Sequence, residues 1–172
     1  MCLPVLTKSS IELPIGLQTN RAAIRERVEL VFGETELLLD LPHNTYEQLA
    51  DGGVIIRKGS VRLPPGELSV LPSHMSGDVV MIRAKHKVTN ILNSMSHGTG
   101  RAMSRSDCKP LADAYDFAIL RKSILIPAGV ENASLRTDGP FAYRDLDECL
   151  ALIEDYVDVV TRLEVIGYMG HL

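Results

Sequence analysis

The segment Leu68-Ser-Val-Leu-Pro-Ser-His-Met-Ser-Gly-Asp-Val-Val-Met-Ile-Arg83 decides the fold class. Its two apolar, partly β-branched runs, Leu68–Leu71 and Val79–Arg83, have the length and composition of strands. Between them, Ser76-Gly77-Asp78 has the composition of a turn. Because so short a connection favours antiparallel pairing, the segment predicts two neighbouring antiparallel strands.

Short apolar runs and helical patterns continue on both sides of this segment. We expect further strands at Leu37–Leu41, Val54–Arg57 and Val159–Met169. We expect helices from a cap at Thr19 or Asn20 to about Phe32, from about Arg105 to Tyr115, and from a cap at Asp145 to about Tyr156. The sequence therefore predicts an α+β fold, with a mixed, mainly antiparallel sheet and flanking helices. Residues 1–172 are expected to form a single domain, with 1–18 as an irregular lead-in.

The composition is that of an ordinary globular protein, with 45% hydrophobic and 23% charged residues among 172. A formal net charge of −4 argues against binding nucleic acid through overall charge. A local basic patch stays possible, and its candidates are Arg57, Lys58, Arg62, Arg101 and Arg105.

The three cysteines form no closely spaced pair, so we expect a reducing, cytoplasmic setting. No apolar run approaches the length of about 18 residues that a membrane span needs, so we expect no membrane partner.

The segment Asn93-Ser-Met-Ser-His-Gly-Thr-Gly-Arg101 carries the strongest chemical signal. Glycine permits unusual backbone angles and lets backbone amides approach a phosphate closely. The planar guanidinium of Arg101 suits phosphate oxygens, and a neutral imidazole at His97 could attack phosphorus. The alternative is a histidine that only satisfies its hydrogen bonds in a glycine-rich turn.

Three other segments could take part in the same chemistry. His43-Asn44 follows an expected strand, where it could present an imidazole to a metal or form an ordinary surface turn. The basic pair in Arg57-Lys58-Gly59-Ser60 could contact RNA phosphates or be simply solvated. The loop Pro72–Asp78 is rich in hydroxyls and small residues, which suits a nucleotide but also suits a plain turn between strands.

The order of these motifs resembles the RtcB family of RNA-splicing ligases, in its carboxy-terminal part. The most specific block is His-Gly-Thr-Gly-Arg-Ala-Met-Ser-Arg at 97–105, followed by Ala142-Tyr-Arg-Asp-Leu-Asp147. The resemblance begins near Thr19 and covers most of the chain. It implies the fold of the carboxy-terminal half of RtcB and a GTP- and Mn²⁺-dependent RNA ligase. Such an enzyme joins RNA 3′-phosphate or 2′,3′-cyclic phosphate ends to 5′-hydroxyl ends, in tRNA splicing or RNA repair.

The resemblance also implies roles for individual residues. His97 would be the catalytic nucleophile that takes GMP from GTP, Arg101 would hold an RNA phosphate, and His43 would be a manganese ligand. The residues implied to contact the nucleotide are His43, Asn44, Pro72, Ser73, His74, Met75, His97, Gly98, Thr99 and Gly100.

The family's remaining metal ligands, an Asp, a Cys and two histidines, precede the matching region, and nothing here matches them. We therefore expect a fragment or split product that needs a separately encoded amino-terminal half, with weak or absent ligation alone. Two alternatives are a non-catalytic nucleotide- or RNA-binding paralogue and a reduced metal site built from His43, His74 and His97. A metal-dependent phosphoesterase is a further alternative. A domain separated from a larger fold should also expose apolar surface, at Cys2–Leu6 and on the middle strands.

Overall fold

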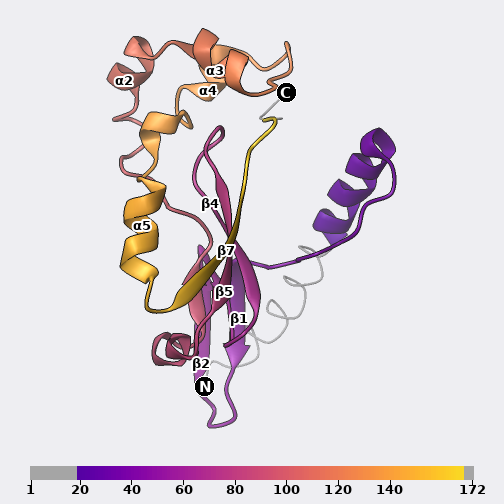
Figure 1. The fold of residues 1–172 in the computed structure, drawn as a ribbon, viewed down its shortest axis with the longest axis vertical. Helices are drawn as coiled ribbons and strands as arrows, with labels where there is room; N and C mark the ends of the chain where they lie inside the picture. The colour runs from indigo at the N-terminus through magenta and orange to yellow at the C-terminus, as the bar shows by residue number, and fades with distance from the viewer. Residues whose placement is uncertain (1–18, 169–172) are drawn as a thin grey trace, which may run out of the picture. The chain divides into compact units, whose positions relative to one another are not determined.

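The computed structural model describes residues 19–168. The chain divides into two compact units between Arg62 and Leu63. Figure 1 shows the helices and strands of both units. The expected lead-in, residues 1–18, lies outside the described residues. The single domain expected over 1–172 stays a prediction. Within residues 19–168, no helix combines the length and apolar character needed to cross a membrane.

The first unit contains a helix and a β-hairpin. Residues 19–32 are helical, and the helix stops at Gly33 as predicted, where a φ of 85° suits a residue without a Cβ. Thr19 and Asn20 are themselves helical, so the cap predicted at one of them is wrong. Strands β1 (Asn44–Gln48) and β2 (Val54–Lys58) pair antiparallel, with Tyr46 opposite Ile56. The short strand β3 (Ser60–Arg62) follows.

The strand predicted at Leu37–Leu41 is wrong, because residues 33–42 have no regular secondary structure. The side chains of Leu37 and Leu38 are exposed, and an apolar run does not become a strand without a hydrogen-bonding partner. The backbone oxygen of His43 instead accepts from the amide of Gly59 at 2.8 Å, where β2 ends. His43 therefore stands at the beginning of a strand, not at the end of one.

The second unit contains a three-stranded antiparallel sheet in the order β4-β5-β7. Strands β4 (Leu68–Pro72) and β5 (Val79–Ala84) pair as the sequence predicted, and β7 (Val157–Leu163) pairs with β5. One face of this sheet is buried, through Ser69, Leu71, Val80, Ile82, Ala84 and Val157. The alternation of buried and less buried positions along β4 and β5 fixes their register.

Short helices and one short strand make up most of the remainder of the second unit. The strand is β6 (Ser94–Ser96). The helices are η1 (His86–Ile91), α2 (Lys109–Ala114), α3 (Phe117–Ser123), α4 (Asn132–Leu135), η2 (Pro140–Ala142) and α5 (Leu146–Ile153). Helices α3 and α4 lie in a region for which the sequence predicted no element. Asp145 caps α5 as predicted, since its Oδ1 accepts from the amide of Glu148 at 2.9 Å.

A hydrophobic cluster holds the helical part of the second unit together. Its buried members are Met75, Ala112, Phe117, Leu120, Ile124, Ile126, Val130 and Leu135. Met75 comes from the β4–β5 connection, so the cluster also fixes that loop.

Apolar side chains are exposed on β2, one of the middle strands where the sequence led us to expect them. Ile56 and Val54 are 80% and 57% exposed. Outside the middle strands, Val159, Val160 and Leu163 of β7 are exposed as well. The other expected location, Cys2–Leu6, lies outside the described residues.

Replacing Leu120 by alanine should lower the free energy of unfolding by about 2–5 kcal/mol, because the side chain is fully buried in the helical cluster. Leu152→Ala is the matched control, since Leu152 lies in α5 and is 81% exposed; its effect should be within about 0.5 kcal/mol. Urea unfolding of both variants measures the difference. Equal losses would contradict this assignment of the core.

Candidate functional site

The glycine-rich loop that follows β6 packs directly against the end of β4. The Thr99 amide donates to the oxygen of Pro72 at 3.1 Å, and the Thr99 hydroxyl donates to the oxygen of Ser73 at 3.4 Å. A Cβ at Gly98 would lie 3.0 Å from the same Pro72 oxygen. Two segments implied to bind nucleotide, 26 residues apart in sequence, are therefore brought together.

The other side of this loop is tied to the segment before α5. The amide of Arg144 donates to the oxygen of Gly100 at 3.1 Å, and the amide of Ala102 donates to the oxygen of Ala142 at 2.8 Å. Gly100 has a φ of 74°, a left-handed conformation that favours glycine. The backbone of the loop is thus held between β4 and residues 142–144.

His97 lies at the start of this held loop, and its side chain is exposed. The neighbouring Ser96 hydroxyl donates to the oxygen of Gly98 at 2.5 Å, which closes a local turn around the histidine. An exposed imidazole on a fixed backbone can reach a phosphorus atom in solution or in a bound nucleotide.

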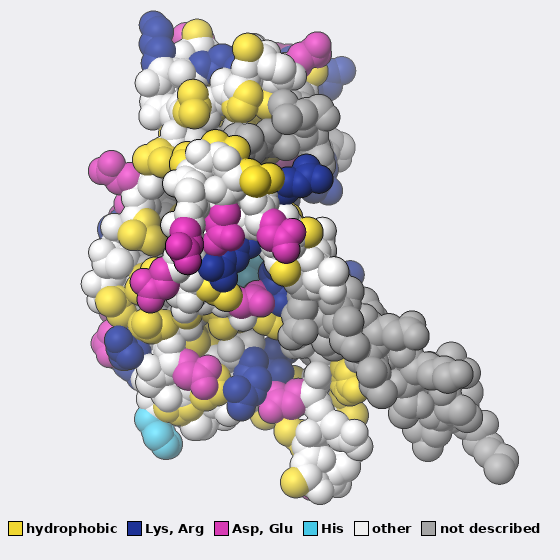
Figure 2. Space-filling view, turned by 90° about the vertical axis from the view of Figure 1, so that its right-hand side faces the viewer, with side chains coloured by type: hydrophobic (Ala, Val, Ile, Leu, Met, Phe, Trp, Pro, Cys, Tyr) yellow, Lys and Arg dark blue, Asp and Glu magenta, His cyan; other side chains and the backbone are white. Residues whose placement is uncertain are grey.

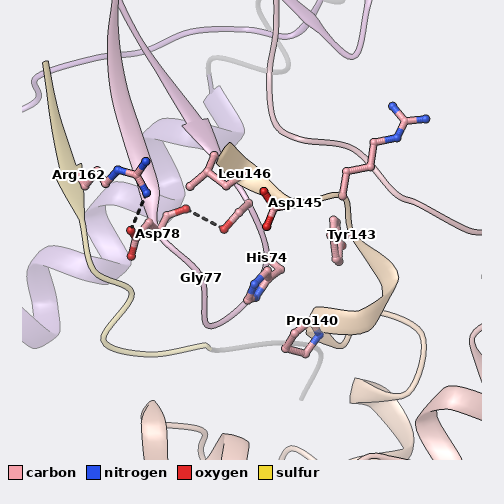
Figure 3. Close-up of a pocket in the computed structure, with 10 residues that line it drawn as sticks. His74, Gly77, Asp78, Pro140, Tyr143, Asp145, Leu146 and Arg162 are labelled. Carbon is pink, nitrogen blue, oxygen red and sulfur yellow. Dashed lines mark hydrogen bonds and ion pairs between the residues drawn. The ribbon is translucent and has the colours of Figure 1, made fainter. Parts of the chain in front are cut away.

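A hollow of about 360 Å³ opens beside the connection between β4 and β5 (Figure 3). Its lining comes from the loop 73–78, from residues 140–146 and from β7. The lining residues are Ser73, His74, Gly77, Asp78, Pro140, Tyr143, Arg144, Asp145, Leu146 and Arg162. Ser73 and His74 were implied as nucleotide contacts, whereas His97 and the glycines of its loop are not part of this lining.

Sequence reasoning missed most of the charged residues in the hollow. Arg144 and Asp145 lie in the Ala142–Asp147 block that supported the family resemblance, so a signal for them was present. Asp78 belongs to the loop considered for a nucleotide and Arg162 to the last expected strand, but the sequence did not predict that they lie together, because their closeness depends on the pairing of β5 with β7. Arg162 forms an ion pair with Asp78, with 3.5 Å between nitrogen and oxygen, and another with Asp147 (Figure 3 shows the first).

His74 is the half-buried imidazole of the hollow. Burial lowers its pKa from the usual 6.5, and the negative charge of Asp78 partly opposes that shift. The imidazole is therefore mostly neutral at pH 7. A Cβ at the neighbouring Gly77 would clash with the Ser73 hydroxyl and lie 2.6 Å from His74 Nε2, so a side chain there would force Ser73 or His74 to move.

Arg101 has contacts within the chain on all three guanidinium nitrogens. Nη1 lies 2.8 Å from Asp138 Oδ1, Nε donates to the oxygen of Met103 at 3.1 Å, and Nη2 lies 3.1 Å from the Cys108 sulfur. Its implied contact with an RNA phosphate stays a prediction, as does the nucleotide contact of Met75, whose side chain is buried in the helical cluster.

Arg57 and Lys58, the basic pair of the first unit, differ in exposure: Lys58 is exposed, whereas Arg57 is buried. The Arg57 side chain is 2% exposed and lies 2.8 Å from Glu47 Oε2. The hydrogen bond from Arg57 holds the pKa of Glu47 below its usual value. On the face drawn in Figure 2, acidic and basic side chains are interspersed, in keeping with the net charge of −4.

The described residues do not complete a manganese site. His43 is exposed in the first unit, and Asn44 is the first residue of β1, with its Oδ1 accepting from the amide of Gly59 at 3.3 Å. Within residues 19–168, no group of three or more His, Cys, Asp or Glu side chains is placed to hold a metal ion. A catalytic metal normally needs about three protein ligands, so manganese binding by His43 would need donors from elsewhere.

A family model described as tRNA-splicing ligase RtcB matches residues 18–170. The chain belongs to the RtcB family. Two curated relatives are similar to it: RNA-splicing ligase RtcB1 of Escherichia coli strain ATCC 25922 and RNA-splicing ligase RtcB of Escherichia coli strain K12. Each is 31% identical over 112 residues, which is 63% of this chain and 26% of the relative. This RtcB-family chain thus spans about a quarter of the length of the curated relatives it matches.

In the RtcB-family chain, the His74 imidazole should titrate below its usual pKa of 6.5, because the half-buried ring is costly to charge. Asp78→Asn should lower the pKa of His74 further, since the carboxylate stabilises the protonated ring. Because protonation is easier in the unfolded chain, stability should fall as pH drops below 6.5. NMR titration of the ring protons measures the shift. Asp113→Asn is the control, because it removes the same charge elsewhere in the chain. A His74 pKa at or above the usual value would contradict the assignment.

Proposed function

We propose that this chain is the guanylylated-histidine part of an RNA ligase that uses GTP and Mn²⁺. The ligase would join RNA 3′-phosphate or 2′,3′-cyclic phosphate ends to 5′-hydroxyl ends, in tRNA splicing or RNA repair. The observation that carries the proposal is the seating of the His97 loop on the end of β4, beside a hollow of nucleotide size. A separately encoded amino-terminal half would supply the metal donors that residues 19–168 do not provide.

The hollow suits a nucleotide by size and by chemistry. Its volume of about 360 Å³ falls in the range of small-molecule sites. Arg144 and Arg162 offer guanidinium groups to phosphate oxygens, while Tyr143 and Asp145 offer polar groups to a base or a ribose. The neutral imidazole of His74 can donate or accept a hydrogen bond without adding charge.

The proposed reaction has three transfers at phosphorus. First, an imidazole nitrogen of His97 bonds to the α-phosphorus of GTP, the bond to pyrophosphate breaks, and the ring loses a proton. Next, an oxygen of the RNA 3′-phosphate attacks the same phosphorus, and the bond to His97 breaks. Finally, the 5′-hydroxyl attacks the 3′-phosphorus, loses its proton, and GMP leaves. A cyclic phosphate end is first opened by water.

The residues of this chain would fix the geometry of these steps. The bonds from Thr99 to Pro72 and Ser73 hold the loop while His97 changes its covalent partner. Mn²⁺ would offset phosphate charge when bound, but the donors within residues 19–168 do not form its site. Cys108 and Cys149 are free thiols, in keeping with the cytoplasmic setting that we propose.

Labelled GTP with Mn²⁺ should leave GMP on His97 when the chain is mixed with the amino-terminal part of the Escherichia coli K12 relative. The chain alone should label weakly or not at all, because residues 19–168 do not complete a metal site. Acid-free quenching and peptide mapping locate the label. His97→Ala should abolish it, whereas His86→Ala, at the start of η1, should not. Label that survives His97→Ala, or none under either condition, would refute the proposal.

A non-catalytic nucleotide- or RNA-binding paralogue is the second candidate, favoured by the incomplete metal donors within residues 19–168. It should bind GMP and a 3′-phosphate oligoribonucleotide without any covalent label on His97. Calorimetric titration with both ligands distinguishes it from the ligase, since binding without transfer supports the paralogue alone. The phosphoesterase alternative shares the need for metal donors, and no observation favours it.

A further inference from the structure

The Asp138 carboxylate pairs with the guanidinium of Arg101, the group that the family resemblance implies for an RNA phosphate. Its Oδ1 lies 2.8 Å from Arg101 Nη1, and its carboxylate geometry resembles two oxygens of a phosphate. The other guanidinium nitrogens face Met103 and Cys108. Because Nη1 and Nη2 each carry a second N–H, a phosphate that binds Arg101 either shares the guanidinium with this carboxylate or displaces it.

Asp138 is itself held firmly. The Thr137 hydroxyl donates to Oδ2 at 2.9 Å, and the Tyr143 hydroxyl donates to Oδ1 at 3.3 Å. The Arg101 guanidinium lies over the Tyr143 ring, with 5.5 Å to the ring centre. Burial and the Asp138 charge raise the pKa of Tyr143, so its hydroxyl stays protonated and keeps donating. Because of these bonds, Asp138 does not move away from Arg101 without cost.

The pair is nevertheless within reach of solvent. The side chains of Arg101 and Asp138 are 24% and 30% exposed, so an incoming anion can approach them from one side. Tyr143 also lines the hollow proposed for the nucleotide, which places the pair next to that site.

We propose that Asp138 is a specificity-determining residue, which reserves Arg101 for a terminal phosphate and rejects the phosphodiesters of the RNA backbone. This inference rests on the proposed function, because it takes Arg101 as the contact for an RNA phosphate. A phosphodiester carries one negative charge, as the carboxylate does, so exchanging one for the other gains little. A terminal phosphate carries about −1.5 to −2 at pH 7 and outcompetes the carboxylate.

Asp138→Asn should weaken this selection. Asparagine keeps the shape and an acceptor oxygen for Tyr143, but it removes the charge that repels a diester. Binding of two otherwise identical 5′-hydroxyl oligoribonucleotides, one ending in a 3′-phosphate and one in a 3′-hydroxyl, is measured by fluorescence anisotropy. Affinity for the 3′-hydroxyl strand should rise more, so that the preference for the 3′-phosphate falls roughly three- to tenfold.

Asp113→Asn is the matched control, because Asp113 forms an exposed ion pair with Arg136 and its loss changes net charge equally. The Asp113→Asn chain should prefer the 3′-phosphate strand as strongly as the unaltered chain does. An unchanged preference in Asp138→Asn would overturn the inference. So would a parallel loss of affinity for both strands, since that is the result expected of a merely structural residue.

A measurement on the unaltered chain tests the same inference without depending on whether the variant folds. Inorganic phosphate should shift the NMR resonance of the Arg101 Nε–H group, whereas dimethyl phosphate, a diester with one charge, should not at the same concentration. Equal shifts with both ions would overturn the inference. GMP labelling of His97 involves no RNA, so failure of this inference and failure of the proposed ligase are seen separately.

Discussion

The hydrogen bond from the Thr99 amide to the Pro72 oxygen is the constraint on which the site depends. It joins the glycine loop to the end of β4, which the sheet and the buried Met75 hold in place. Gly98 must lack a side chain for this approach, since a Cβ would meet the same oxygen at 3.0 Å. An exposed histidine on an unsupported glycine loop would sample many positions, and this bond removes most of that freedom.

The β4–β5 hairpin could be predicted because its information is local. The β4–β5 hairpin has two apolar runs and a short turn, and the cap at Asp145 has a side chain suited to the free amides of α5. Strand β1 could not be predicted in the same way. Its sequence, Asn44-Thr-Tyr-Glu-Gln48, is mostly polar and becomes a strand through pairing with β2, while the more apolar run at Leu37–Leu41 has no such pairing.

The candidate site was predictable only in part, for a related reason. The block around His97 and the loop after β4 can be recognised in the sequence, because glycine, histidine and hydroxyl residues are grouped there. The ion pair of Asp78 with Arg162 joins residues that are 84 positions apart (162 − 78), and only the β5–β7 pairing brings them together. The closeness of Asp138 to Arg101 likewise depends on the bridge between Arg101 and Tyr143.

The histidine loop and a metal site need different kinds of interaction to hold them. Backbone hydrogen bonds and apolar packing hold the loop, the hollow and the Arg101–Asp138 pair within one polypeptide. A catalytic metal instead needs several side-chain donors at one point, and such a group is not present within residues 19–168. The histidine loop is held by backbone hydrogen bonds and not by metal donors, so residues 63–168 keep the loop and the hollow in place without such a group. In the proposed ligase, metal-dependent chemistry would draw on donors from outside residues 19–168, while this chain would contribute the histidine loop and the hollow.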